Sequence, residues 1–427
     1  MSPRWLRLLI AASLLATAVV VWAATQSPNG PTKAQLAAAV SRRPIVVHVP
    51  AAVRTTATVD VTSTVTAPAG SVTVTDTVTS SVASSSAAAT SSHASTAAPT
   101  KTTSAAAKTA KSPIQHVFVI VLSSPGYAQT WGSGSAATYL NGQLRPKGTL
   151  LSGYSAVSAD DLPNYIAMVS AQPPNPDTEQ DCPVFATFPQ SAPVSKSGVV
   201  QGSGCVYPET VLTLPDQVTS SGHVWHGYIE DLASGSPPVT SCRHPNTGQP
   251  DNAVTPVTGD QYLTRHNPFV YFGSLLDLGD CASDDVDLGA LSSDLASASK
   301  TPELSYIVPN ACDDGTDAPC VDGAAGGLEA EDAFLQTWVP KILAAPAYRT
   351  GLVVITFATP AAGAASDQVG ALLLSPYVAA GKTEATGYNH YSLVRSIEDL
   401  FGLTHLAEAS SASVPSFASL VSSKPQP

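Results

Sequence analysis

The stretch VFVIVLSSPGY at residues 117–127 starts as a run of six apolar residues and changes abruptly to two serines and a proline. A continuous apolar run without polar alternation is typical of a strand that is covered on both faces. Three later runs have the same character: LSYIVP at 304–309, GLVVITFA at 351–358 and GALLLSPYV at 370–378. The sequence therefore predicts a sheet in the interior of a domain.

Segments with helical periodicity lie between these predicted strands. Apolar residues recur at helical spacing in LPNYIAMVSA at 162–171, in 329–346 and in YSLVRSIEDLFGL at 391–403. Strands that alternate with helices predict an α/β fold, a three-layer sandwich with a mostly parallel central sheet. Ligands of such sheets bind beyond the carboxyl ends of the strands, which is where Ser123 and Ser124 follow the first strand.

The N-terminal quarter has a different composition from the rest. Arg4 and Arg7 precede an uncharged apolar run over residues 8–24, which predicts an export signal, either a cleaved peptide or a retained membrane anchor. Residues 25–112 are rich in Thr, Ser and Ala and are predicted to be a disordered linker. Within it, VTSTVTAPAGSVTVTDTVTS at 61–80 could form a hairpin, but its composition favours an extended linker.

The globular domain is expected over 113–410, followed by a flexible tail at 411–427. Its cysteines are even in number, and an exported chain is exposed to oxidising conditions, so disulfides are expected. Nearest-neighbour pairing is the interpretation adopted, and no Cys-x-x-Cys spacing supports a zinc site. The predicted pairs are Cys182 with Cys205, Cys242 with Cys281, and Cys312 with Cys320.

The net charge is −12 at pH 7, and only 12% of the residues are charged. Nucleic-acid partners reward clustered Lys and Arg, which the predicted domain lacks, so such a partner is not expected. Contact with a membrane is expected only through the N-terminal segment. The partner expected from export is an extracellular ligand of unknown identity.

Seven ordered stretches carry a resemblance to a known family. Residues 114 to about 407 resemble the secreted bacterial phosphoesterases of the acid phosphatase and phospholipase C type, within the alkaline phosphatase superfamily. The resemblance implies an alkaline-phosphatase-like fold and hydrolysis of phosphate esters by a hydroxyl nucleophile and bound metal ions. The stretches are HVFVIVL at 116–122, LPNYIAMVSAQ at 162–172, TLPDQV at 213–218, RHNPFVYF at 265–272, VPNAC at 308–312, GLVVITF at 351–357 and YNHYSLVRSIEDLFGL at 388–403.

The chain departs from this family at the positions that carry its chemistry. Ser123 and Ser124 stand where the family has an acid and an amide that help to hold metal, and serine hydroxyls are poor ligands for a divalent cation. Ala358 and Thr359 replace an acid pair at the end of another strand. Before the 162–171 helix, where the family places a hydroxyl nucleophile, the chain has Ala159, Asp160 and Asp161.

Several polar residues of the family motifs persist. His266, Asn267 and Asn310 are candidates for lining the site, and Asp317 and His390 are candidates for vestigial metal ligands. Each also has a structural interpretation, since turns and helix caps use the same side chains. His223 and His226 fit a strand, which would place them on opposite faces, better than a metal-binding helix.

Two hypotheses follow from these departures. The favoured one is an exported phosphoesterase-family protein that has lost catalysis and serves as an extracellular binding or scaffold domain, with no cofactor. Losing the nucleophile and the metal ligands together should leave little activity. The alternative is an active phosphoesterase with a rewired site, in which Asp161 is the nucleophile and a divalent metal is required.

Overall fold

The structure is a computed structural model and describes residues 59–67, 70–78, 112–123, 125–360 and 366–426. The chain divides into two units, Met1–Thr103 and Ser104–Pro427. The predicted export signal, most of the predicted linker and Ser124 lie outside the described residues. Within the described part, no helix is both long enough and apolar enough to cross a membrane.

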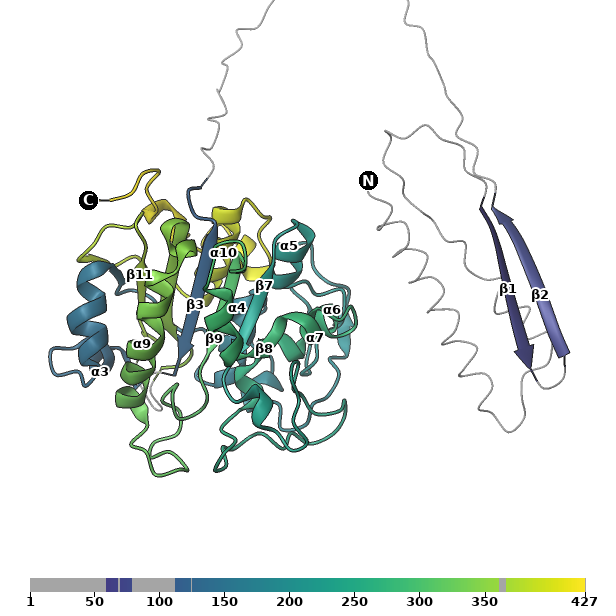
Figure 1. Cartoon of the computed structure of the whole chain (residues 1–427), viewed down its shortest axis with the longest axis horizontal. Helices are drawn as coiled ribbons and strands as arrows, with labels where there is room; N and C mark the ends of the chain where they lie inside the picture. Colours follow the sequence, from purple (N-terminus) through teal and green to yellow (C-terminus); the bar gives the residue numbers. More distant parts are fainter. Residues whose placement is uncertain (1–58, 68–69, 79–111, 124, 361–365, 427) are drawn as a thin grey trace, which may run out of the picture. The chain divides into compact units, whose positions relative to one another are not determined.

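The described part of the first unit is a hairpin. Strand β1 (Val59–Ala67) pairs antiparallel with β2 (Gly70–Val78) along their whole lengths (Figure 1). This pairing is the hairpin that the sequence allowed within the predicted linker. Its alternating Thr and Val residues are β-branched types that favour strands.

The second unit is built on an eight-stranded sheet with the order β12-β4-β11-β10-β3-β9-β7-β8. Five neighbouring pairs are parallel, and the two pairs that β11 makes are antiparallel. The predicted mostly parallel sheet is confirmed. Its strands are β3 (His116–Leu122), β4 (Thr149–Leu151), β7 (Trp225–Ile229), β8 (Asp285–Asp287), β9 (Leu304–Val308), β10 (Gly351–Phe357), β11 (Ala371–Leu374) and β12 (Lys382–Glu384).

The central strands are the continuous apolar runs of the sequence. Every residue of β3 and of β10 is buried, and the two strands pair in register from His116 with Gly351 to Leu122 with Phe357. Because β10, β3, β9 and β7 are parallel neighbours, their carboxyl ends lie at one edge of the sheet and their amino ends at the other.

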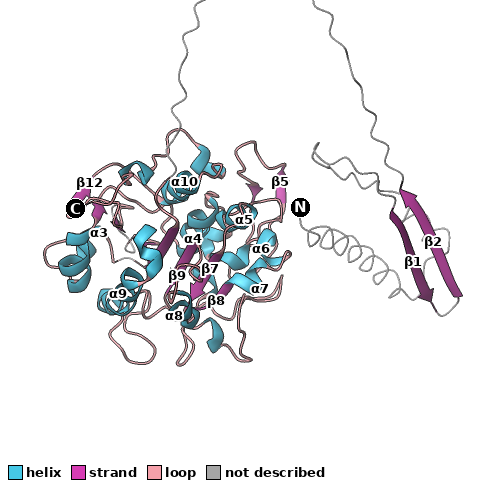
Figure 2. Ribbon diagram, turned by 45° about the horizontal axis from the view of Figure 1, so that its top comes forward, coloured by secondary structure: helices cyan, strands magenta, loops and turns pink. Residues whose placement is uncertain are grey.

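Helices cover both faces of this sheet. Figure 2 shows α9 and α8 on one side of the strands, and α4, α5 and α10 on the other. The predicted α/β/α sandwich is thus confirmed. The helices are α3 (Tyr127–Trp131), α4 (Asp161–Ser170), α5 (Leu214–Ser220), α6 (Gly273–Leu276), α7 (Asp280–Asp284), α8 (Leu291–Asp294), α9 (Gly327–Ala344) and α10 (His390–Phe401).

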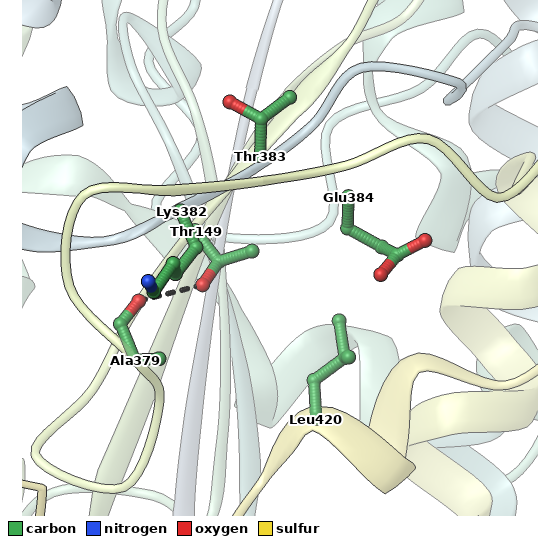
Figure 3. Close-up of a pocket in the computed structure, with 6 residues that line it drawn as sticks. All are labelled: Thr149, Ala379, Lys382, Thr383, Glu384 and Leu420. Atoms are coloured by element: carbon green, nitrogen blue, oxygen red, sulfur yellow. Dashed lines mark hydrogen bonds between the residues drawn. The ribbon is translucent and has the colours of Figure 1, made fainter.

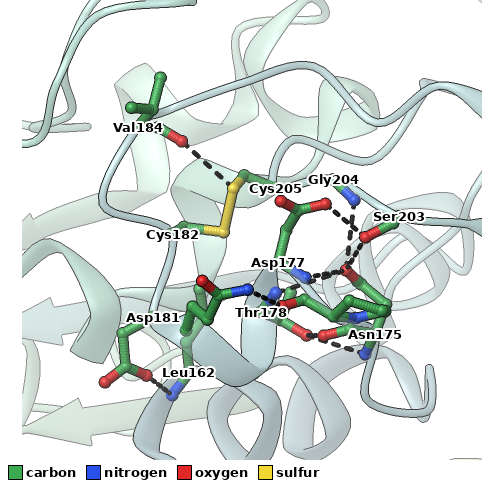
Figure 4. The surroundings of a disulfide bond; sticks show 12 residues. Leu162, Asn175, Asp177, Thr178, Asp181, Cys182, Val184, Ser203, Gly204 and Cys205 are labelled. Carbon is green, nitrogen blue, oxygen red and sulfur yellow. Dashed lines mark hydrogen bonds between the residues drawn. A yellow bond between two sulfur atoms is a disulfide. The ribbon is translucent and has the colours of Figure 1, made fainter.

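The three predicted disulfides are all present: Cys182–Cys205, Cys242–Cys281 and Cys312–Cys320. The first fixes a long loop that carries the small hairpin of β5 (Gln190–Ala192) and β6 (Gln201–Gly202). Around it, Asn175 and Asp177 accept hydrogen bonds from the Ser203 hydroxyl (Figure 4). The adjacent Asp181 carboxylate accepts from the Leu162 amide at 2.9 Å, which ties this loop to the start of α4.

The expected flexible tail at 411–427 is instead attached to the domain, and its backbone contacts continue to Gln426, whose amide donates to the Pro376 carbonyl at 2.7 Å. Phe417, in the short helix Phe417–Leu420, is completely buried, and its ring lies edge-on to Tyr388. The Phe417 amide donates to the Ser396 hydroxyl of α10 at 2.8 Å. An aromatic side chain in a segment of small residues thus anchors the chain end in the core.

Candidate functional site

Helix α4 begins at the carboxyl edge of the sheet with the predicted nucleophile position. Asp161 is its first residue, and Asp160 is its N-cap. The Asp161 Oδ2 atom accepts hydrogen bonds from Arg265 Nε at 2.9 Å and from His266 Nε2 at 3.2 Å. The carboxylate therefore lies against two cationic groups of the protein itself.

His266 lies between two carboxylates. Its Nε2 atom contacts Asp161, and its Nδ1 atom is 2.7 Å from the Asp314 Oδ2 atom, which is fully buried. The Tyr165 ring of α4 stacks on the imidazole at 4.9 Å between centroids. A ring with an acid at each nitrogen is held in the doubly protonated, charged form.

The charges of this cluster, defined as Asp161, Arg265, His266 and Asp314, shift the pKa values of His266 and Asp161. Burial alone would lower the pKa of His266, but Asp314 and Asp161 outweigh burial and raise that pKa to about 9. Burial would likewise raise the pKa of Asp161, but His266 and Arg265 hold it well below its usual value. The cluster is thus a closed set of ion pairs, in which each charged group is paired with another member of the cluster.

The ends of the two central strands carry no acid side chain. The Ser123 amide, directly after β3, donates to the backbone carbonyl of Asp314 at 2.7 Å. After β10, the Ala358 amide donates to the Leu122 carbonyl at 2.7 Å, and Ala358 and Thr359 are both buried. These positions supply backbone hydrogen bonds between loops.

His390 is a structural residue of the interior. It is completely buried, donates from Nε2 to the Ala358 carbonyl at 2.8 Å and accepts at Nδ1 from the Tyr154 hydroxyl at 3.0 Å. Burial lowers its pKa to about 4, so the ring is neutral. Both nitrogens are occupied, which leaves no lone pair for a metal ion.

The remaining candidates make local or structural hydrogen bonds. Asn267 donates to the buried Asp285 carboxyl at 2.8 Å and caps the short helix Pro268–Tyr271. The Asn310 side chain accepts from the amides of Cys312 and Asp313, which shapes the loop after β9. The Asp317 carboxylate accepts from the Val321 amide at 2.8 Å within the Cys312–Cys320 region.

Comparison with known proteins identifies the family of this chain. The model of the Phosphoesterase family matches residues 133–404, which include the whole cluster. The chain belongs to this family.

Curated relatives of this phosphoesterase-family chain are fungal. It is 23% identical over 267 residues to an acid phosphatase of Aspergillus fumigatus, covering 62% of this chain and 50% of that protein. It is 26% identical over 267 residues to a phosphate-repressible acid phosphatase of Penicillium chrysogenum, covering 62% and 54% respectively. The chain thus spans about half the length of these relatives.

Solved structures with a similar fold share little sequence with it. A protein of the alkaline phosphatase superfamily from Vibrio parahaemolyticus superposes with a TM-score of 0.40 at 12% identity, covering 69% of this chain and 67% of that one. A 2-O GAG sulfatase superposes with a TM-score of 0.43 at 15% identity, covering 74% and 76%.

A divalent metal, which the family resemblance implies, does not fit the residues of this phosphoesterase-family chain. In the described part, three potential ligand atoms come within 4.8 Å of one another only in two groups: Cys242 with Cys281 and Asp285, and Cys312 with Cys320 and Asp322. Each group contains both sulfurs of a disulfide, which are not thiolate ligands. Neither group includes a residue of the cluster.

Only part of this site could be predicted from the sequence. Two of the predicted site residues, Asp161 and His266, are in contact. The others make their hydrogen bonds outside the cluster: His390, Asn267, Asn310 and Asp317. Arg265 opens the stretch RHNPFVYF, and Asp314 lies two residues after VPNAC. The sequence gives no sign that either residue contacts Asp161 or His266. The contact of residues more than 100 positions apart in the sequence needed the folded chain.

Two cavities of the described part lie away from the cluster. One, of about 250 Å³, sits at the β12 edge of the sheet, where the Thr149 hydroxyl donates to the Ala379 carbonyl at 2.6 Å (Figure 3). It is lined by Thr149, Ala379, Lys382, Thr383, Glu384 and Leu420. The other lies at the amino ends of the central strands.

Proposed function

We propose that this phosphoesterase-family chain has lost hydrolysis of phosphate esters and serves as an extracellular binding or scaffold domain. The observation that carries the proposal is the closed set of ion pairs in which Asp161 lies. Its Oδ2 atom accepts hydrogen bonds from Arg265 and His266, and His266 contacts Asp314 in turn. Both charged hydrogen bonds stabilise the ionised carboxylate, and a carboxylate that is stabilised in this way is a weaker nucleophile.

The charge around Asp161 also opposes a phosphate substrate. Asp314 and Asp181 lie near the same two cations, with Asp181 Oδ2 at 3.7 Å from Arg265 Nε. The protein's own acids thus already neutralise the protein's own cations. An incoming phosphate would meet carboxylates without a metal ion to screen them, which raises the barrier to attack.

The extracellular part of the proposal rests on other features. The chain has an N-terminal apolar run after two arginines, and all six cysteines are paired in disulfides. Disulfides of this kind persist in oxidising compartments. The domain is then either secreted or held at the cell surface by its N-terminal segment, and its partner is an extracellular ligand or a phosphate ester that it binds without turnover.

The test combines metal analysis with activity. The purified full chain is analysed for bound metals and assayed with p-nitrophenyl phosphate and bis(p-nitrophenyl) phosphate, each with added zinc, manganese or calcium. An acid phosphatase assayed in parallel shows that the conditions detect turnover. We expect no stoichiometric metal and no hydrolysis above the buffer blank.

The matched variants are Asp161→Asn, which keeps the shape of the side chain, and Asp161→Ala. A stoichiometric metal together with turnover that both variants abolish would overturn the proposal. That result would establish the rewired phosphoesterase that uses Asp161 as its nucleophile.

A further inference from the structure

The larger cavity lies at the amino ends of the central strands, whereas the cluster lies at their carboxyl ends. Its volume is about 610 Å³, within the range of small-molecule sites in proteins. His116 is the first residue of β3, Glu303 directly precedes β9, and His223 comes two residues before β7. Side chains at or just before the amino ends of three neighbouring parallel strands thus line one cavity, together with the last turn of α10.

The charged groups of this cavity are acidic. The Glu303 Oε2 atom accepts from the Val224 amide at 2.8 Å, and Oε1 lies 3.6 Å from His223 Nδ1. The Asp399 Oδ1 atom is 2.8 Å from His405 Nε2. Both carboxylates keep about a third of their side-chain surface exposed, 31% and 36%. No Lys or Arg is among the described residues that line the cavity, so imidazoles are its only basic groups.

Apolar groups form the rest of the wall. Phe401 at the end of α10 lies against His223, with ring centroids 6.0 Å apart, and Ile114 and Leu400 are buried beside the cavity. An aromatic face attracts a cation through its quadrupole, and aliphatic side chains bury an apolar stem. Carboxylates beside an aromatic ring repel phosphate and favour a positive charge.

We propose that this cavity binds a small organic cation, a primary ammonium group on an apolar stem. The ammonium group lies between the Glu303 and Asp399 carboxylates, and the stem packs on Phe401. A bare divalent metal fits less well, because these residues do not bring three ligand atoms within 4.8 Å of one another. The site is independent of the cluster and of the proposed loss of hydrolysis.

The experiment is a titration of the full chain with benzylammonium chloride by calorimetry, repeated by saturation-transfer NMR. Benzyl alcohol, which is neutral, and benzoate, which is anionic, have nearly the same shape and serve as matched probes. We expect saturable binding of one equivalent of benzylammonium, weaker binding of benzyl alcohol and no binding of benzoate. Equal binding of the first two probes, or no saturable binding of benzylammonium up to 10 mM probe, roughly the weak limit for a specific small ligand, overturns the proposal.

Variants locate the site. Glu303→Gln keeps an oxygen acceptor for the Val224 amide, and Asp399→Asn keeps the side-chain shape. Each is expected to weaken benzylammonium binding about fivefold, as expected for loss of one partly exposed charge pair. Glu209→Gln is the control, because Glu209 is exposed and outside the cavity lining. Equal weakening in Glu209→Gln would mean that the overall negative charge attracts the probe, and it would overturn the assigned site.

A metal ion is tested in the same way. Zinc chloride is titrated alone and in competition with benzylammonium. Tight binding of zinc that depends on His116 and His223, without any binding of benzylammonium, contradicts the proposal.

Discussion

His266 has a carboxylate at each ring nitrogen and a tyrosine ring on its face, so the fold depends on its charge. Replacing it by glutamine leaves the buried Asp314 without its cationic partner. We expect His266→Gln to lower the free energy of unfolding by about 3–5 kcal/mol, the cost of breaking a buried ion pair from one side. Urea unfolding measures this, with His244→Gln as the control, because His244 is exposed and should change stability by less than about 0.5 kcal/mol.

The same residue sets a pH dependence. The pKa of His266 is raised from 6.5 to about 9 in the folded chain, so its contribution is complete below pH 6.5 and lost as the pH rises to 9. This loss corresponds to roughly 3 kcal/mol for the wild type. The difference in unfolding free energy between wild type and His266→Gln should therefore shrink across that window. A constant difference would contradict a charged His266.

Glu331 is a second buried acid near Asp314. Its Oε2 atom has no hydrogen-bond partner, and its side chain lies in space that a Cβ at Gly315 would fill, 2.2 Å from Oε1. Burial, with Asp314 and Asp332 adding to it, raises the pKa of Glu331 well above its usual value. The folded chain thus keeps a proton that the unfolded chain releases above about pH 4.5.

Replacing Glu331 by the neutral residue glutamine should stabilise the protein at neutral pH. We expect the free energy of unfolding of Glu331→Gln to be higher than that of wild type at pH 7.5 and nearly the same as that of wild type at pH 4.5. Thermal unfolding at the two pH values measures it. Glu329→Gln is the control, because Glu329 is exposed in the first turn of the same helix α9 and its replacement should change stability little.

At the scale of elements, His390 joins helix α10 to the end of β10 through the Ala358 carbonyl. We expect His390→Leu to destabilise the protein by about 1–3 kcal/mol, because the buried carbonyl loses its donor. Melting temperatures with zinc or with EDTA should be equal for wild type and should remain equal in the variant. A zinc-dependent rise that disappears in His390→Leu would show that this residue binds metal.

The elements that the sequence predicted are those with long, uniform patterns. The seven buried residues of β10 are long enough to show a nearly continuous apolar run, and the twelve residues of α10 are long enough to show a helical period. Strands β4, β8 and β12 have three residues each, which is too short for any period, and only their pairing in the sheet defines them. The same reason explains why Arg265 and Asp314 were missed as partners, since no local pattern reports a contact across the fold.

At the scale of the whole molecule, several acids are buried as neutral groups. Burial raises the pKa of Asp285 to about 8 despite the hydrogen bond from Asn267, and it raises that of Glu398 to about 8. The unfolded chain releases these protons near pH 4, so the folded state holds more protons between about pH 4 and 8. Their contribution to stability is full below pH 4 and decreases as the pH rises to 8. The effect of Asp161 on stability has the opposite sign. Its pKa is lowered in the folded chain, so it destabilises the protein only when strong acid protonates it.

These signs together predict that the domain is most stable in mild acid. We expect the free energy of unfolding to be at least about 3 kcal/mol higher at pH 5 than at pH 8.5, because both buried acids and His266 lose their contributions over this interval. Urea unfolding followed by tryptophan fluorescence measures it, with Trp225, which is buried in strand β7, as a reporter. The double variant Asp285→Asn with Glu398→Gln should flatten the profile. Stability that is constant or that rises from pH 5 to 8.5 would mean that these acids are ionised in the folded chain, and it would contradict the prediction.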